Sequence, residues 1–376
     1  MNQIKRLLCT LLLALCLLGL TACGAVDPTP PDPLSAPAVR TVTDCFGRVV
    51  EIPATVKTIV CTGSGALRMV SYLQCTDRLV GVEDTDKQYE TSTLRDYAHV
   101  NYQIFAPLPS IGKGGGTGNT AYLEELMQLQ PDVILSGYNQ EALEDLAKAT
   151  GIPCVSIRAR SINFVDESFY TAMGVAAEVL GAETRCGEVL QYIDDCKADL
   201  AERTAGVDQG KTPSVYTGAV TFSGAHGFTG TYAQFGPFLG IGAKNVADET
   251  GETGYFDADM EKIIAWDPDL IFLDPGNLDL VREEIRTNPA FFQSLRAVRE
   301  GKVYSAVAFN NYSTNVGYAL ADAYYAGTVL FPDRFADLDI AAKTDEILEF
   351  LLGDGYYDEM VADGLSFGVI DLGFTQ

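Results

Sequence analysis

The sequence is poor in the residues on which most catalytic and metal centres depend. It holds two histidines, His99 and His226, and one tryptophan among 376 residues. With only two histidines, a hydrolase built on a serine, a histidine and a carboxylate is not favoured. Its cysteines show neither the Cys-x-x-Cys nor the Cys/His spacing of a zinc site. These absences argue against an enzyme and against a dedicated metal centre.

Basic residues are scarce as well. The chain has 26 Lys and Arg against 51 Asp and Glu, which gives a formal net charge of -25. A surface with this balance repels nucleic acid through its mean field, so we expect no nucleic-acid partner.

The N-terminal apolar run is too short to cross a bilayer. Leu7–Leu20 follows Lys5 and Arg6, and a spanning helix needs about 20 apolar residues. The pattern is typical of a signal peptide over residues 1–22. Its end, Leu-Thr-Ala-Cys at residues 20–23, resembles the bacterial lipobox, in which the cysteine is acylated. We therefore expect a mature chain that begins at Cys23 and is anchored by lipid on the outer face of the cell membrane.

Residues 23–38 are rich in proline and predict a semi-extended tether. About 335 residues remain, which favours two lobes over one. We predict an N-terminal α/β lobe over residues 39–165, a helical segment over 166–206 and a C-terminal α/β lobe over 207–376. Six further cysteines permit disulfides, but their spacing fixes no pairing.

Short apolar runs alternate with helical patterns in both predicted lobes. In the first lobe, strands are expected at 58–61, 79–82, 132–135 and 153–157, and helices at 65–73, 122–129 and 140–150. In the second, strands are expected at 214–217, 270–273 and 303–306, and a helix at 314–330. This alternation predicts mainly parallel sheets.

The intervening segment carries no strand pattern. Two helical runs meet at Gly181, and the second, 183–203, has an apolar stripe that predicts a long amphipathic helix between the lobes.

One internal similarity links the two lobes. Residues 123–135 and 260–272 each begin with a helix that carries a glutamate at its second position, Glu124 or Glu261. Each helix ends at a Pro-Asp pair just before a buried strand. The repeat predicts pseudo-symmetric lobes, although two ordinary helix–strand junctions could also resemble each other by chance.

Together with the segments 43–53, 57–60 and 310–315, these repeats resemble the periplasmic binding proteins for ferric siderophores, haem and corrinoids. The resemblance implies a class III periplasmic binding protein fold, two lobes joined by one rigid helix with a ligand cleft between them. It also implies a partner, the dimeric permease of an ABC importer with its ATPase. Glu124 and Glu261 map onto the glutamates that dock on permease arginines. Their alternative role is to favour the positive end of each helix dipole.

The predicted cleft residues lie in loops that follow strands, where open α/β sheets bind ligands. From the first lobe we select Ser64, Arg68, Gly115, Thr117, Tyr138 and Asn139. The glycine-rich run 112–118 lacks the Walker spacing, so its backbone N–H groups could face an anion or the loop could simply be flexible. Arg68 could pair with a carboxylate or oxoanion, or be a surface arginine.

From the second lobe we select Ser223, His226, Tyr255, Phe256, Asn311 and Tyr312. His226 is a candidate contact to a metal or an oxyanion, against a structural role, and the aromatic residues suit a planar or catecholate ligand. Core packing is the alternative for Phe256.

These features rank the transported ligands. A ferric siderophore or haem comes first, molybdate or tungstate second, and a corrinoid such as cobalamin third, because Trp266 is the chain's only tryptophan and its pattern predicts burial. No intrinsic cofactor is expected beyond the transported metal complex. A chelatase-like enzyme of related layout is the distant alternative, and the export signal argues against it.

Overall fold

The computed structural model describes residues 38–159, 165–208 and 210–374. The predicted signal peptide, Cys23 and the tether up to residue 37 lie outside the described residues. The compact unit Arg40–Gln376 contains the whole α/β fold that follows. No helix among the described residues combines the length and the apolar character needed to cross a membrane.

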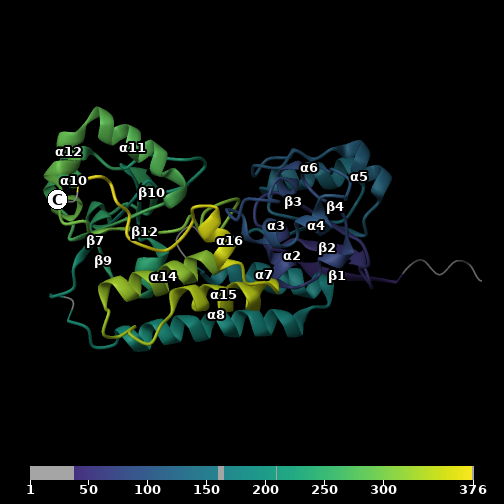
Figure 1. Cartoon of the computed structure of the whole chain (residues 1–376). Helices are drawn as coiled ribbons and strands as arrows, with labels where there is room; N and C mark the ends of the chain where they lie inside the picture. The colour runs from purple at the N-terminus through teal and green to yellow at the C-terminus, as the bar shows by residue number, and fades with distance from the viewer. Residues whose placement is uncertain (1–37, 160–164, 209, 375–376) are drawn as a thin grey trace, which may run out of the picture. The chain divides into compact units, whose positions relative to one another are not determined.

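Two parallel four-stranded sheets form the centres of two lobes (Figure 1). The N-lobe sheet has the order β4-β3-β5-β6, with β3 (Ile59–Thr62), β4 (Leu79–Gly81), β5 (Val133–Ser136) and β6 (Cys154–Ser156). The C-lobe sheet has the order β12-β11-β7-β9, with β7 (Ser214–Gly218), β9 (Lys244–Asn245), β11 (Leu270–Leu273) and β12 (Val303–Ser305). The predicted α/β class and the predicted strands are thus confirmed.

Both sheets are covered on both faces, which explains their continuously apolar strands. Along β5, Val133 and Leu135 join the large core cluster, whereas Ile134 faces a second cluster with residues of α5 (Leu123–Leu129) and α6 (Gln140–Thr150). The remaining N-lobe helices are α2 (Ala66–Tyr72), α3 (Asp96–Val100) and α4 (Tyr102–Phe105). The C-lobe helices are α9 (Gly236–Gly240), α10 (Met260–Trp266), α11 (Leu278–Thr287), α12 (Pro289–Ser294) and α13 (Arg296–Arg299).

The predicted internal repeat is a real structural repeat. Helices α5 and α10 both end in a left-handed residue, Gln130 and Asp267, immediately before the Pro-Asp pair. The aspartate that follows then ties the amino ends of two strands together. Asp132 accepts from the backbone N–H of Thr58 at 2.9 Å, and Asp269 accepts from that of Ser214 at 2.8 Å.

Two antiparallel ribbons complete the lobes. β1 (Val39–Thr43) pairs with β2 (Val49–Pro53), and β8 (Gly230–Ala233) pairs with β10 (Gly254–Asp257). In the turn of the first ribbon, Asp44 binds the Arg48 guanidinium and also accepts from the backbone N–H of Ser156 on β6 at 3.2 Å. The ribbon is thereby attached to the N-lobe sheet.

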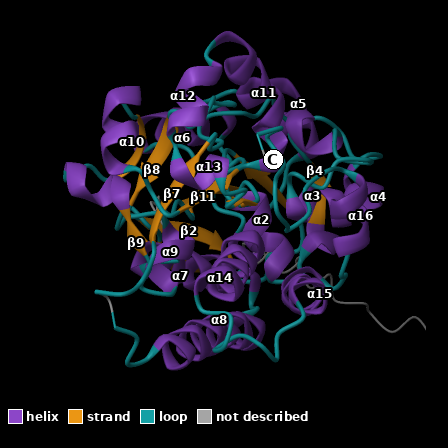
Figure 2. Ribbon diagram, turned by 60° about the vertical axis from the view of Figure 1, so that its left-hand side comes forward, coloured by secondary structure: helices purple, strands orange, loops and turns teal. Residues whose placement is uncertain are grey.

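A layer of long helices lies beneath both lobes (Figures 1 and 2). It consists of α7 (Glu167–Leu180), α8 (Glu183–Thr204), α14 (Val316–Leu330) and α15 (Ile340–Leu352), with the short α16 (Tyr357–Ala362) nearby. The predicted long helix is α8, and it buries Val189, Ile193 and Leu200 on one face. Arg185 near its start donates to the Tyr72 carbonyl of the N-lobe, and α8 also contacts α9 of the C-lobe.

The C-terminal helices contact both lobes. α15 packs on α14 and also contacts α2 of the N-lobe. The six cysteines of the described residues are free thiols, and all except the half-buried Cys45 are buried.

Candidate functional site

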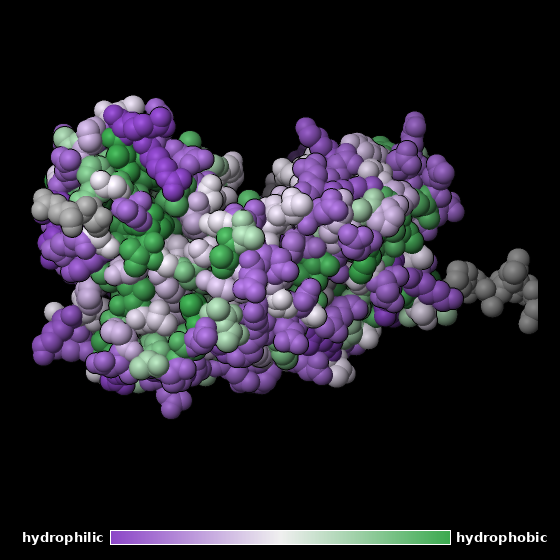
Figure 3. Space-filling model, viewed as in Figure 1, coloured by the Kyte–Doolittle hydropathy of each residue, from purple (hydrophilic) through white to green (hydrophobic). Residues whose placement is uncertain are grey.

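A cavity of about 470 Å³ lies between the lobes, at the carboxyl ends of their strands. Figure 3 shows a hollow between the lobes on the side opposite α8. The N-lobe wall contains Ser64 after β3, the loop 115–117 before α5, and Arg158 with Ala159 after β6. The C-lobe wall contains Phe222 and Ser223 after β7, and Asn310, Tyr312 and Ser313 after β12.

The charge of this lining differs from that of the whole chain. Arg158 is the one charged side chain among the described lining residues, which include no carboxylate, histidine or cysteine. Hydroxyl groups come from Ser64, Thr117, Ser223 and Ser313, and the rest is mainly glycine, amide and aromatic surface. In a protein with 51 acidic residues, a lining whose described residues include an arginine and no carboxylate suits an anion better than a bare metal cation.

The glycine-rich loop forms one edge of the cavity. Gly114 has a φ of +75°, and a Cβ there would lie 2.5 Å from Thr85 Cγ2 and 3.1 Å from Glu83 Oε2. The loop can therefore pack this closely against Thr85 and Glu83 only with glycine at this position. The next residue, Gly115, donates its backbone N–H to the Tyr312 hydroxyl at 3.0 Å. This bond joins the loop to the C-lobe wall.

A histidine supports the opposite wall from behind. The ring of Phe222 stacks on Tyr255 at a centroid distance of 5.2 Å. His226 Nε2 lies 2.9 Å from the Phe222 carbonyl, and His226 Nδ1 lies 2.7 Å from the Tyr255 hydroxyl. Because a carbonyl can only accept, Nε2 carries a proton. Both nitrogens of His226 thus have protein partners, and its ring positions the Phe222 loop.

The loop 310–315 is held in a strained conformation by the N-lobe. Tyr312 and Ser313 have φ values of +55° and +76°, a region in which residues other than glycine are uncommon. Arg68 Nη1 donates to the Tyr312 carbonyl at 2.9 Å, and Arg68 Nη2 donates to the Asn311 carbonyl at 2.8 Å. The same guanidinium pairs with Asp96 at 2.9 Å, and both side chains are buried.

Arg95 provides a second attachment for this loop. It donates to Asn311 Oδ1 at 3.2 Å, lies over the Tyr312 ring at 4.4 Å, and pairs with the buried Asp86 at 3.1 Å. Two N-lobe arginines therefore fix the C-lobe residues that line the cavity.

The structure brings together five of the twelve predicted ligand contacts: Ser64, Gly115, Thr117, Ser223 and Tyr312. Arg68 and Asn311 lie beneath the cavity wall and bind each other. Tyr138 is buried with its hydroxyl near Thr120 and Glu83, and Asn139 caps α6.

The remaining predicted contacts lie farther from the lining. Phe256 packs against the second core cluster of the C-lobe, and His226 and Tyr255 stand behind Phe222. Among the described residues, no three His, Cys, Asp or Glu side chains come together as a metal site, so His226 belongs to no such group there.

Sequence reasoning missed Arg158 and Ser313 as contacts. Arg158 is the first charged residue after the predicted strand 153–157, so its position in the sequence could have identified it. Ser313 faces the cavity only because of the left-handed backbone at Tyr312 and Ser313.

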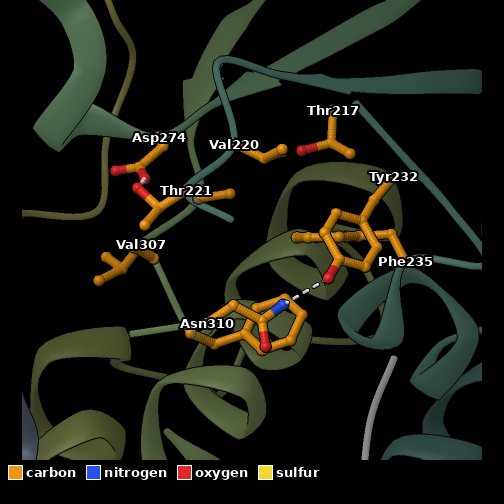
Figure 4. A pocket seen from close by; sticks show the side chains of 11 residues that line it. Thr217, Val220, Thr221, Tyr232, Phe235, Asp274, Val307 and Asn310 are labelled. Carbon is orange, nitrogen blue, oxygen red and sulfur yellow. Dashed lines mark hydrogen bonds between the residues drawn. The ribbon is translucent and has the colours of Figure 1, made fainter. Parts of the chain in front are cut away.

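A smaller cavity, of about 20 Å³, adjoins the first in the C-lobe (Figure 4). Asn310 lines both cavities and donates to the Tyr232 hydroxyl at 3.0 Å. The carboxylate of Asp274 accepts from the Thr221 hydroxyl at 2.6 Å. Burial raises the pKa of Asp274 from 3.8 to about 6. In size the cavity suits one or two water molecules.

Two parallel-sheet lobes, one connecting helix and a cavity between the lobes define a two-lobed solute-binding protein. The family model described as periplasmic binding protein matches residues 59–308. The chain therefore belongs to the periplasmic binding protein family.

Two relatives are named for binding metal species. The chain is 25% identical over 355 residues to the molybdate-binding protein MolA of Haemophilus influenzae. This alignment covers 87% of this chain and 95% of MolA. It is 24% identical over 196 residues to the Fe(3+)-citrate-binding protein YfmC of Bacillus subtilis. This second alignment covers 51% of this chain and 58% of YfmC.

Solved structures share the fold. A periplasmic solute-binding protein from Veillonella parvula gives a TM-score of 0.67 at 19% identity, covering 87% of this chain and 97% of that one. Molybdate-bound MolA gives a TM-score of 0.63 at 19% identity, covering 84% and 99%.

Proposed function

We propose that this protein is the lipid-anchored, extracytoplasmic binding component of an ABC importer, and that it captures an anionic, metal-containing solute in the interlobe cavity. The observation that carries the ligand class is the lining, whose described residues include Arg158 and several hydroxyl groups but no carboxylate. An arginine in a partly dehydrated cavity stabilises an anion through charge-assisted hydrogen bonds.

A tetrahedral oxoanion, molybdate or tungstate, is the first candidate. Ser64, Thr117, Ser223 and Ser313 offer short hydroxyl donors from both lobes, as an oxoanion with several acceptor oxygens requires. A relative that covers most of this chain is named for binding molybdate. We therefore reverse the order expected from the sequence, in which a ferric complex came first.

An anionic ferric complex is the second candidate, and the volume of the cavity favours it. About 470 Å³ lies within the range of roughly 300–1,000 Å³ that accommodates drug-sized ligands. Phe222 and Tyr312 supply aromatic surface on one wall. A corrinoid fits this lining less well, because Trp266 stands in α10, outside the lining residues.

Thermal denaturation in a panel of ligands tests the proposal. We expect tungstate and molybdate to stabilise the protein, by about 2.7 kcal/mol at 100 times the dissociation constant, whereas sulfate has a smaller effect. Ferric citrate, haemin and cobalamin complete the panel. Stabilisation by ferric citrate or haemin alone selects the second candidate. Stabilisation by a divalent cation alone contradicts an anionic ligand.

Arg158 is the residue to replace. We expect Arg158→Gln to weaken tungstate binding by about tenfold to a hundredfold, since a hydrogen bond to a charged group contributes roughly 1.5–3 kcal/mol. Arg282→Gln is the matched control, because Arg282 is an exposed arginine on α11 outside this cavity. Titration calorimetry measures both. Equal affinity of the two variants would place the anion elsewhere.

Membrane attachment is proposed to depend on Cys23, which lies outside the described residues. We propose that its acylation follows removal of residues 1–22 and that the proline-rich segment tethers the lobes to the bilayer. Two or more acyl chains hold a protein stably, whereas one chain binds only marginally.

Glu124 and Glu261 are proposed to dock the protein on its permease. Both are exposed in the first turns of α5 and α10, and Figure 1 shows these helices in different lobes, both away from α8. Matched charges on pseudo-symmetric lobes suit a permease dimer, because they fix orientation and speed the encounter.

The double variant Glu124→Ala/Glu261→Ala is expected to lower uptake about tenfold, since exposed ion pairs contribute up to about 1 kcal/mol each. Ligand affinity should stay unchanged. Glu178→Ala/Glu183→Ala, on the exposed faces of α7 and α8, is the control. Uptake assays with vesicle-embedded importer measure the effect, and equal uptake by both variants would argue that the glutamates serve only their helices.

A further inference from the structure

A buried carboxylate lies directly beneath the anion cavity. Glu83 follows β4 and is 1% exposed. Its carboxylate accepts from the backbone N–H of Gly63 at 3.0 Å, from the Tyr138 hydroxyl at 3.3 Å and from the Tyr312 hydroxyl. No ion pair to Glu83 occurs among the described residues, so hydrogen bonds alone support its charge.

Glu83 is connected to the cavity through Tyr312. Gly115 and Tyr312 both line the cavity, and the Gly115 N–H donates to the hydroxyl that itself donates to Glu83. Gly114 covers the carboxylate so closely that a Cβ there would lie 3.1 Å from Oε2. The cavity and Glu83 are thus separated by one hydroxyl and one layer of backbone.

The surroundings do not neutralise this carboxylate. The titratable and charged groups around it are Asp86 on the following turn, Cys61 on β3, Tyr138 after β5, Tyr312 on the C-lobe loop, and Arg95, which lies over Tyr312 and pairs with Asp86. The neighbouring Asp84 is engaged at the surface by Tyr122. Arg95 forms an ion pair with Asp86 and not with Glu83. An anion that enters the cavity would therefore add a negative charge near the Glu83 carboxylate, which has no cation beside it.

We propose that Glu83 takes up a proton from solvent when an anion enters the cavity, and that this reverses the hydrogen bond with Tyr312. In the empty protein the Tyr312 hydroxyl donates to the carboxylate. In the loaded protein the protonated Glu83 donates to the tyrosine oxygen, and Tyr312 turns its own proton toward the anion. One proton enters and forms the O–H bond of Glu83, no covalent bond is broken, and the cavity gains a hydrogen-bond donor. The inference rests on the anionic ligand proposed above.

The ionisation of Glu83 is compatible with this switch. Burial raises its pKa from 4.5 to about 7, although the hydrogen bond from Tyr312 acts in the opposite direction. A group with this pKa is largely ionised just above neutral pH and becomes protonated when a second negative charge approaches. Anion affinity should therefore increase as pH falls through this region, by at most tenfold per pH unit, and level off below it.

Titration calorimetry with sodium tungstate tests the switch. Just above neutral pH, the binding enthalpy should vary linearly with the ionisation enthalpy of the buffer, as measured in PIPES, imidazole and Tris. The slope should correspond to uptake of a fraction of one proton per anion. Glu83→Gln should abolish this slope while retaining binding. Tyr312→Phe should weaken binding and reduce the slope, because the donor is lost.

Asp322→Asn is the matched control. Asp322 is also a buried carboxylate, but it lies on α14 and outside the cavity lining, so this variant should keep the wild-type slope. Tungstate binding without buffer dependence, or an equal slope in Glu83→Gln, overturns the switch and leaves the proposed function intact. If neither tungstate, molybdate nor ferric citrate binds, the anionic function and the switch both fail.

Discussion

Replacing Arg68 by methionine is expected to lower the free energy of unfolding by about 3–5 kcal/mol. The Arg68 and Asp96 side chains are 2% and 0% exposed, so the variant leaves a buried carboxylate without its cation. The carbonyls of Asn311 and Tyr312 also lose their donors. Domains typically have only about 5–15 kcal/mol of stability, so this single change removes a large part of it.

Urea denaturation measures the loss, and two further variants identify its cause. Arg282→Met, whose ion pair with Asp279 is exposed, should change stability by no more than about 0.5 kcal/mol. Arg68→Met/Asp96→Asn should recover part of the loss, because it also removes the unpaired charge. A loss below about 1 kcal/mol in Arg68→Met alone would mean that water reaches this region.

The protein is expected to be more stable at mildly acidic pH than above neutral pH. Burial raises the pKa of Glu83 from 4.5 to about 7 and that of Asp274 from 3.8 to about 6. Each folded carboxyl therefore binds its proton more tightly than the unfolded one does. Its contribution is fully present below the unfolded pKa and is lost as pH rises through the folded pKa.

The effect on stability is large because the carboxyl groups of Glu83 and Asp274 both lose their protons over the same pH range. Each shift of about two units corresponds to about 3 kcal/mol, as one unit corresponds to roughly 1.4 kcal/mol. We expect urea midpoints to fall between about pH 4.5 and 7.5, and the double variant Glu83→Gln/Asp274→Asn to flatten this slope. A wild-type midpoint that rises over the same range would contradict the prediction.

Much of the fold could be read from the sequence because local patterns agree with the final structure. Helix α6 occupies the predicted residues, since Asn139 caps its start and Gly151 ends it in a left-handed conformation. The repeated Pro-Asp pairs correctly located α5, β5, α10 and β11. The β8–β10 ribbon was missed, because its strands lie 20 residues apart and carry no hairpin turn signal.

The site was harder to predict, because its residues converge only after the two lobes are placed. Sequence position identified the loops that follow the strands, but not which side chains face the cavity. Arg68 illustrates the difficulty. It has the sequence setting of an exposed arginine near a helix start, yet it is buried under the C-lobe loop. Trp266, predicted to be buried, is only half-buried.

The Asp132 and Asp269 ties have a consequence for how solute specificity can change. They lie at the amino ends of the strands, whereas Ser64, Arg158 and Ser223 follow the carboxyl ends. Strand register is thus secured at the edge of each sheet that never meets the solute. Loops at the opposite edge can accumulate substitutions without misaligning either sheet, so one scaffold can evolve toward a new cargo through a few loop residues.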